Sequence, residues 1–158
     1  MGKRTLIIES RQTPEQPGYL DTIVLANNHL LWHGACSTCP NPTKPWPLSW
    51  VKWNFAYGWA ACGSYIWECV VSKKHGKCLC INAGDLIPAR APNRNHDGRR
   101  VVGAVLVHRG WSATWRGSAG CITVPPAEWD RFMSFFAYGD TGPLNIIDYS
   151  KMNTTGTR

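Results

Sequence analysis

The sequence has no long hydrophobic run. Its longest near-continuous apolar stretch, Val101–Val107, is about a third of the ~20 residues that a membrane-spanning helix requires, so we expect no membrane span. The N-terminal apolar stretch, Leu6–Ile8, is short and ends at Glu9, and we therefore expect no secretory signal peptide.

Charged residues are also few, at 17% of the 158 residues, whereas 44% are apolar. This composition excludes a disordered polyelectrolyte, and the length predicts a single folded domain over residues 1–158. Acidic residues are the scarcer charge, with 10 Asp and Glu against 17 Lys and Arg, which gives a formal charge of +7. A basic surface fits an anionic polymer. The basic residues are scattered except for Arg94, Arg99 and Arg100, and no nucleic-acid-binding motif is present, so we expect nucleic acid not to be the partner.

Long helical patterns are rare as well. Short apolar or alternating segments, each bounded by turn residues, predict a strand-rich chain. These segments are Leu6–Ile8, Thr22–Leu25, Leu30–Trp32, Tyr65–Val71, Cys78–Ile81 and Val101–Val107.

One helix is predicted after Pro125 and Pro126, which suit a first helical turn. Its apolar residues recur at helical spacing, and Gly139 is expected to stop it. The apolar set is Trp129, Phe132, Met133 and Phe136. A final strand is predicted over Leu144–Ile147, and residues 151–158 are expected to form a flexible tail.

Residues 33–62 are rich in Trp, Pro and Cys, and they predict a loop insertion. Tryptophans of this part of the chain could stack on sugar rings or could pack in the core, as most Trp side chains do. Those considered are Trp46, Trp50, Trp53, Trp59 and Trp67.

Seven cysteines are present, and an odd number leaves at least one thiol unpaired. Cys36-x-x-Cys39 and Cys78-x-Cys80 could together hold zinc, although the second pair departs from the usual spacing. Disulfides among the six cysteines other than Cys121, and reduced core thiols, are the alternatives.

The segment from residue 103 to residue 124 carries the strongest functional signal. An apolar stretch ends at His108, twelve residues separate His108 from Cys121, and Gly120-Cys121 opens a second apolar stretch. Such a pattern is typical of a cysteine nucleophile with a histidine base, because a nearby imidazole can generate the thiolate and backbone N–H groups can bind an oxyanion. His96 is the reserve base, and His75, in a lysine-rich turn, is expected to be solvated.

These residues resemble the signature of the L,D-transpeptidase catalytic domain (the YkuD-like family). The matching positions are His108, Gly110, Ser118, Gly120, Cys121 and Ile122, and Gly63–Ile66 resembles the Gly-x-Tyr strand that precedes the site. The resemblance implies a mostly β fold (β-rich α+β), a sandwich or barrel with one main helix after the cysteine. Ala119 replaces a second His of the family, and Thr123 replaces an Arg. The short interval between His108 and Cys121 resembles compact variants found in phage proteins and in toxins injected into competing bacteria.

The resemblance also implies a mechanism without a cofactor. His108 would deprotonate Cys121, the backbone carbonyl of Arg109 would orient the imidazole, and N–H groups of Ala119, Gly120 and Cys121 would hold the oxyanion. The predicted substrate contacts are Tyr65, Trp111, Trp115, Arg116 and Ser118, with Arg116 or Arg109 as stand-ins for the missing family Arg.

The implied substrate is a peptidoglycan stem peptide, attacked at the carbonyl that joins diaminopimelate to a terminal D-alanine. Transfer of the thioester to an amine or to water would decide between transpeptidase, exchange, carboxypeptidase and endopeptidase activity. We expect action in the periplasm or cell wall after phage release or injection, with a delivery system or an immunity protein as partner. The alternative is a non-catalytic module, stapled by zinc or disulfides, that binds glycan or nucleic acid.

Overall fold

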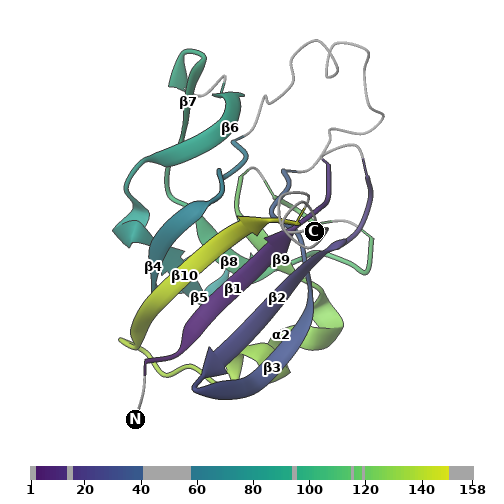
Figure 1. Cartoon of the computed structure of the whole chain (residues 1–158), viewed down its shortest axis with the longest axis vertical. Coiled ribbons are helices and arrows are strands. Elements are labelled where there is room, and N and C mark those ends of the chain that lie inside the picture. Colours follow the sequence, from purple (N-terminus) through teal and green to yellow (C-terminus); the bar gives the residue numbers. More distant parts are fainter. Residues whose placement is uncertain are drawn as a thin grey trace, which may run out of the picture.

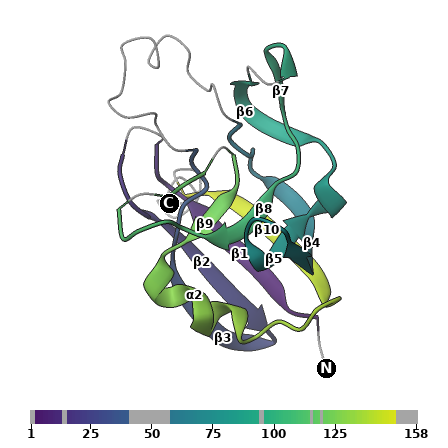
Figure 2. The same ribbon diagram turned by 180° about the vertical axis from the view of Figure 1, so that it is seen from behind.

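The computed structural model describes residues 3–13, 16–40, 58–93, 96–114, 116–118 and 120–149 (Figures 1 and 2). This part of the chain is mostly β, as predicted, and forms a nearly closed, barrel-like sheet. Its elements are β1 (Thr5–Ser10), β2 (Asp21–Asn27), β3 (His29–Cys36), β4 (Gly63–Ser72), β5 (Gly76–Ile81), the 3-10 turn η1 (Asn82–Gly84), β6 (Ile87–Asn93), β7 (Arg99–Val102), β8 (Leu106–Arg109), β9 (Ile122–Val124), the helix α2 (Pro126–Met133) and β10 (Thr141–Asp148).

The main sheet has the strand order β3-β2-β1-β10-β4-β5-β8-β9. The pairs β1–β10 and β8–β9 are parallel, and the other neighbours are antiparallel. Just after β3, Ser37 pairs with Thr123 of β9 through two backbone hydrogen bonds of 2.9 Å. This bridge joins the two ends of the sheet. Strands β6 and β7 form a separate two-stranded sheet that projects from the barrel (Figure 1).

The core lies inside the barrel, because alternate residues of each strand point to the same face. Leu6, Leu25, Leu79 and Val107, from four different strands, are fully buried there. The helix adds aromatic side chains to this core: Phe132 contacts Trp32 of β3 at 5.1 Å between ring centroids. Figure 2 shows α2 lying near one end of the barrel, beside β3.

Beyond the helix, Phe136 is also buried, and it packs edge-on against Trp67 of β4 at 5.0 Å. The helix itself ends at Met133. The predicted stop at Gly139 is therefore wrong, since Phe136 follows the helical spacing but reaches the core from the turn after the helix.

Two further predictions are corrected by the structure. The apolar run Val101–Val107 is not one strand, because the chain breaks between β7 and β8, where Ala104 has a φ of 51°. Strand β6 was not predicted, since Pro88 and Pro92 mark this segment as irregular in sequence. It pairs with β7 in the small sheet, and its Ala89 also forms an isolated antiparallel bridge with Ala60.

The predicted insertion 33–62 begins too early, because β3 runs through His33 to Cys36. Residues 41–57 and the predicted tail, 151–158, lie outside the described residues. Among the helices that the structure describes, none is long and apolar enough to cross a membrane.

Candidate active site

The fold places Cys121 and His108 on one face of the sheet at the β8–β9 pair. Val107 and Ile122 are register partners in this parallel pair, and both point into the core. His108 and Thr123 are the next partners, so they lie on the opposite, outer face. Cys121 directly precedes β9, and its Sγ accepts a hydrogen bond from the Leu106 N–H at 3.4 Å.

Strand geometry sets the separation of the candidate base and nucleophile. His108 lies two residues beyond Leu106 on β8, and Cys121 lies beside Leu106. With neighbouring strands about 4.8 Å apart and a rise of about 3.3 Å per residue, the two Cα atoms are roughly 8 Å apart. Two side chains that extend from such diagonal positions can meet.

The imidazole of His108 is held by a neighbouring carbonyl. Its Nδ1 lies 2.8 Å from the backbone oxygen of Arg109, the group that the family resemblance assigns to orienting the ring. A carbonyl oxygen can only accept, so Nδ1 carries the proton and the neutral ring keeps its lone pair on Nε2. This is the tautomer that can take a proton from a thiol.

Burial keeps this ring neutral. His108 is only 1% exposed, and burial lowers its pKa from 6.5 to about 4. The Arg109 carbonyl raises the pKa of His108, while His75 and Lys74 lower it further. Near pH 7 the ring is therefore a free base, as a general base must be.

Cys121 is in the protonated form at rest. Its side chain is partly buried, and burial raises the pKa of its thiol. The Leu106 N–H and the Lys74 ammonium act in the opposite direction, and Cys80 raises the pKa of Cys121 again. The thiol thus needs a base to become a nucleophile.

His75 was expected to be solvated, and its side chain is half-buried, with one face of the ring covered. Its ring stacks on that of His108, with centroids 3.8 Å apart and an angle of 17° between the planes. His75 lies in the β4–β5 turn, some thirty residues earlier in the chain. Only the order of the strands in the sheet brings the turn to His108, so no local sequence signal identifies this contact.

The turn before β9 is stabilised from within. Ser118 is 2% exposed; its hydroxyl donates to the Cys121 carbonyl at 2.6 Å and accepts from the Gly120 N–H at 3.1 Å. Ser118 therefore supports the backbone around Cys121 rather than facing a substrate, and the Gly120 N–H already has a partner. Ala119, the other predicted oxyanion donor, lies outside the described residues.

Arg116 is placed where it cannot meet a substrate carboxylate. It is 1% exposed, and its guanidinium donates to the carbonyls of Gln16, Gly18 and Pro40 at 2.8, 3.3 and 2.7 Å. It therefore binds the loop after β8 to two other segments, which corrects the predicted role. Its candidate substitute, Arg109, is exposed.

The remaining predicted substrate contacts are dispersed. Trp111 is 64% exposed, and its ring packs over Gly117, whereas Trp115 lies outside the described residues. Tyr65 is buried on β4, and its hydroxyl donates to the Ala61 carbonyl at 2.7 Å. Since β5 separates β4 from β8, the structure does not bring Tyr65 to Cys121.

All seven cysteines are free thiols in the structure. Cys36 and Cys39 are buried beside Asp21, and this burial raises the pKa of both thiols. Cys78 and Cys80 lie on β5. No group of three or more His, Cys, Asp or Glu side chains among the described residues is arranged to hold a metal ion, so the two cysteine pairs are not brought together as a zinc site.

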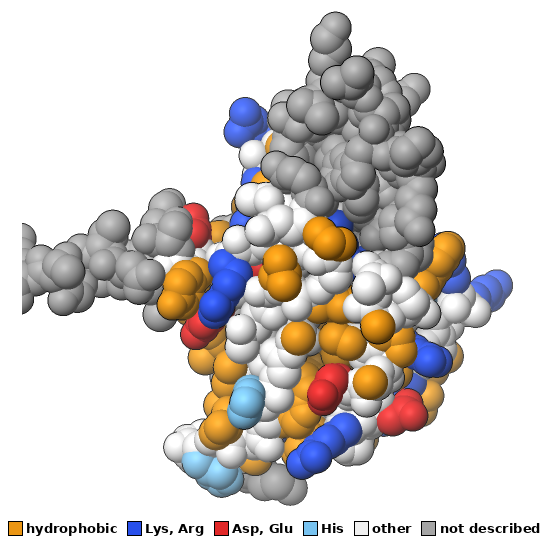
Figure 3. Space-filling model, turned by 90° about the vertical axis from the view of Figure 1, so that its right-hand side faces the viewer, with side chains coloured by type: hydrophobic (Ala, Val, Ile, Leu, Met, Phe, Trp, Pro, Cys, Tyr) orange, Lys and Arg blue, Asp and Glu red, His pale blue; other side chains and the backbone are white. Residues whose placement is uncertain are grey.

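Of the tryptophans considered as a sugar platform, Trp67 is buried in the core. The guanidinium of Arg90 lies over the ring of Trp59, 4.4 Å from the ring centroid. Trp46, Trp50 and Trp53 lie outside the described residues, as does Arg94 of the basic group. His96, the reserve base, lies in the β6–β7 turn of the small sheet. Lys and Arg side chains are scattered among acidic and hydrophobic ones on the face shown in Figure 3.

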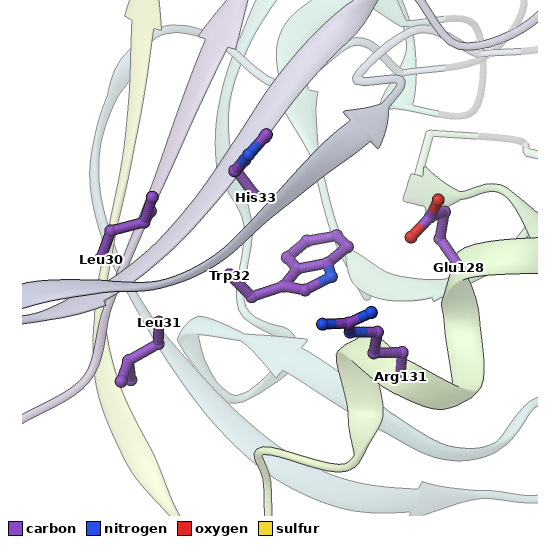
Figure 4. Close-up of a pocket in the computed structure, with 6 residues that line it drawn as sticks. All are labelled: Leu30, Leu31, Trp32, His33, Glu128 and Arg131. Atoms are coloured by element: carbon purple, nitrogen blue, oxygen red, sulfur yellow. The ribbon is translucent and has the colours of Figure 1, made fainter.

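A separate hollow of about 330 Å³ lies between β3 and α2. Figure 4 shows Trp32 of β3 pointing toward Glu128 and Arg131 of α2 in this hollow, with Leu30, Leu31 and His33 from the same strand. Trp32 is 6% exposed, since it packs against Phe132. The hollow is formed by different elements from those that carry Cys121 and His108.

Comparisons of the chain with protein-family models, with curated proteins and with solved structures found no match. The class that the structure itself defines is a mostly β protein with a histidine on β8 and a cysteine directly before the adjacent parallel strand β9. The resemblance to the L,D-transpeptidase domain stays a prediction.

Proposed function

We propose that this protein is a cysteine enzyme that acts on peptidoglycan stem peptides through a thioester acyl-enzyme. The observation that carries the proposal is the arrangement of Cys121 and His108 on the outer face of β9 and β8, with His108 Nδ1 held by the Arg109 carbonyl. A neutral imidazole with its lone pair on Nε2 and a thiol on the same face of the sheet are the pair that acyl transfer by a cysteine requires.

In the proposed reaction, His108 Nε2 takes the proton of Cys121. The thiolate attacks the carbonyl carbon that joins diaminopimelate to D-alanine, and the oxyanion is held by the Cys121 N–H. The C–N bond breaks, the imidazolium returns its proton to the departing amine, and a thioester remains. An amine of another stem, a free D-amino acid or water then displaces Cys121.

The substrate rests on the family resemblance, and the basic surface supports it. With a formal charge of +7, the protein is attracted to anionic polymers such as bacterial cell wall. A site of action in the periplasm or cell wall, after phage release or injection, belongs to the same proposal.

The test is muropeptide analysis of purified cell wall after incubation with the protein. We expect stems that lack terminal D-alanine, new cross-links, or both, with activity reduced at least about a thousandfold in Cys121→Ala because the nucleophile is lost. Cys62→Ala is the matched control, because Cys62 is an exposed free thiol directly before β4. A muropeptide profile that wild-type protein leaves unchanged, or that Cys121→Ala changes equally, would refute the proposal.

Added glycine or a D-amino acid separates transfer from hydrolysis. Incorporation of the added amine into stems would identify a transferase, whereas loss of D-alanine without incorporation would identify a peptidase.

A further inference from the structure

The ring of His108 is restrained from two directions. The Arg109 carbonyl oxygen lies 2.8 Å from Nδ1, and the His75 ring covers one face of the imidazole, with ring centroids 3.8 Å apart. The hydrogen bond alone would still let the ring tilt about the line that joins it to the carbonyl. The parallel stack removes that freedom, because a tilt of His108 would drive its edge into the ring of His75.

The β4–β5 turn is built to hold His75 in place. Register partners Ser72 and Gly76 close the hairpin, and Gly76 has a φ of 66°, which favours glycine. The Ser72 hydroxyl accepts from the N–H groups of Lys74 and His75, both at 3.3 Å. The backbone that carries the His75 ring is thereby fixed relative to β5, the strand beside β8.

We propose that His75 is a positioning residue, which aims the Nε2 lone pair of His108 at the Cys121 thiol by stacking on the imidazole. The inference rests on the proposed function only for the identity of the reaction, since the stacking itself concerns the base and the thiol. His75 transfers no proton in this proposal. A flat ring of the same size should therefore replace it, and a small side chain should not.

The first test follows the rate at which iodoacetamide alkylates Cys121. Tryptic peptide 117–131 contains Cys121 as its only cysteine, so mass spectrometry reports this thiol separately from the other six. We expect His75→Ala to slow alkylation about tenfold, because the misdirected base no longer assists loss of the thiol proton. His75→Phe should keep most of the wild-type rate. His29→Ala removes an exposed histidine of β3 and is the matched control.

The second test observes His108 directly by ¹⁵N NMR of the imidazole nitrogens, which needs no substrate. Wild type and His75→Phe should show one tautomer, protonated on Nδ1, with a low pKa of His108. In His75→Ala, water reaches the open face of the ring, so both tautomers should appear and the pKa of His108 should rise toward its ordinary value. A merely structural role for His75 would change the stability of the fold without changing the tautomer.

The two proposals fail in different ways. If His75→Ala leaves both the tautomer and the alkylation rate of Cys121 as in wild type, or if His75→Phe is as impaired as His75→Ala, the positioning role is overturned. If these variants behave as expected but cell wall is never modified, the positioning role stands and the proposed substrate is wrong.

Discussion

At the scale of single residues, the electrostatics of Cys121 depend on Lys74. This lysine lies in the same turn as His75, and its positive charge lowers the pKa of the thiol while also lowering the pKa of His108. A cation therefore favours the thiolate and disfavours the protonated base. The first effect favours the nucleophile, whereas the second makes His108 a weaker base toward the thiol proton.

Replacement of Lys74 should make Cys121 less reactive. In Lys74→Met the pKa of Cys121 rises, so the thiolate fraction near pH 7.5 falls, and we expect alkylation of peptide 117–131 to slow about two- to fivefold, the range for a solvent-exposed charge. The pH–rate profile should shift to higher pH. Lys73→Met, the neighbouring lysine of the same turn, is the control, and an equal effect of both variants would show that net charge alone matters.

Residue types were predicted better than residue environments. Cys121 and His108 could be chosen from sequence because a Gly-Cys pair after a strand-end histidine is a local pattern, and the Arg109 carbonyl was chosen from the family resemblance. Arg116 and His75 could not be assigned, since an arginine that binds three carbonyls looks the same in sequence as one that faces solvent. The same holds for a histidine that stacks across strands.

At the scale of elements, the turn between β8 and β9 decides where the thiol lies. Gly120 has a φ of 135°, and a Cβ at this position would come within 3.0 Å of the Gly58 carbonyl oxygen and 3.1 Å of Val102. The chain thus passes close to the backbone at Gly58 immediately before Cys121. Only glycine satisfies both the dihedral angle and the close approach.

We predict that Gly120→Ala is far more damaging than a glycine substitution in an open turn. The backbone strain and the contact with Gly58 together should lower the free energy of unfolding by about 2–4 kcal/mol and displace Cys121, so alkylation by iodoacetamide should lose its dependence on His108. Urea unfolding measures the first effect and the rate for peptide 117–131 the second.

Gly98→Ala provides the comparison for this prediction. Gly98 also has a positive φ, 76°, but a Cβ there would meet nothing within 4 Å, so only the conformational cost of about 1 kcal/mol applies. Equal losses in the two variants would mean that the close approach to Gly58 contributes nothing.

Most strands were predictable because each carries its own apolar pattern and turn residues. The break within Val101–Val107 was not, since Gly103–Val105 is as apolar as the strands on either side, and the chain leaves the small sheet there to join the large one. Likewise, Pro88 and Pro92 concealed β6. These elements are decided by partners that lie far away in sequence.

At the scale of the whole molecule, the closure of the sheet explains why the site is partly buried. The Ser37–Thr123 bridge places β9 between β8 and the end of β3, and the β4–β5 turn lies over His108 through the stack with His75. A base enclosed in this way stays neutral, and its burial makes the stability of the entire fold depend on pH.

Stability should fall as the solution becomes more acidic than pH 6.5. The pKa of His108 is about 4 in the folded protein against 6.5 for an unburied histidine, so between these values the unfolded chain binds a proton that the folded protein does not, and unfolding is favoured. Above pH 6.5 neither state is protonated and the effect vanishes. From pH 7.5 to pH 4.5, His108 alone should lower the free energy of unfolding by about 2.5 kcal/mol.

Urea unfolding of wild type and His108→Gln at several pH values measures this difference, since glutamine does not titrate. His29→Gln, at an exposed position of β3, is the control and should keep the wild-type dependence of stability on pH. If the stability of His108→Gln changed with pH as much as that of wild type, the folded imidazole would titrate normally and the prediction would be wrong.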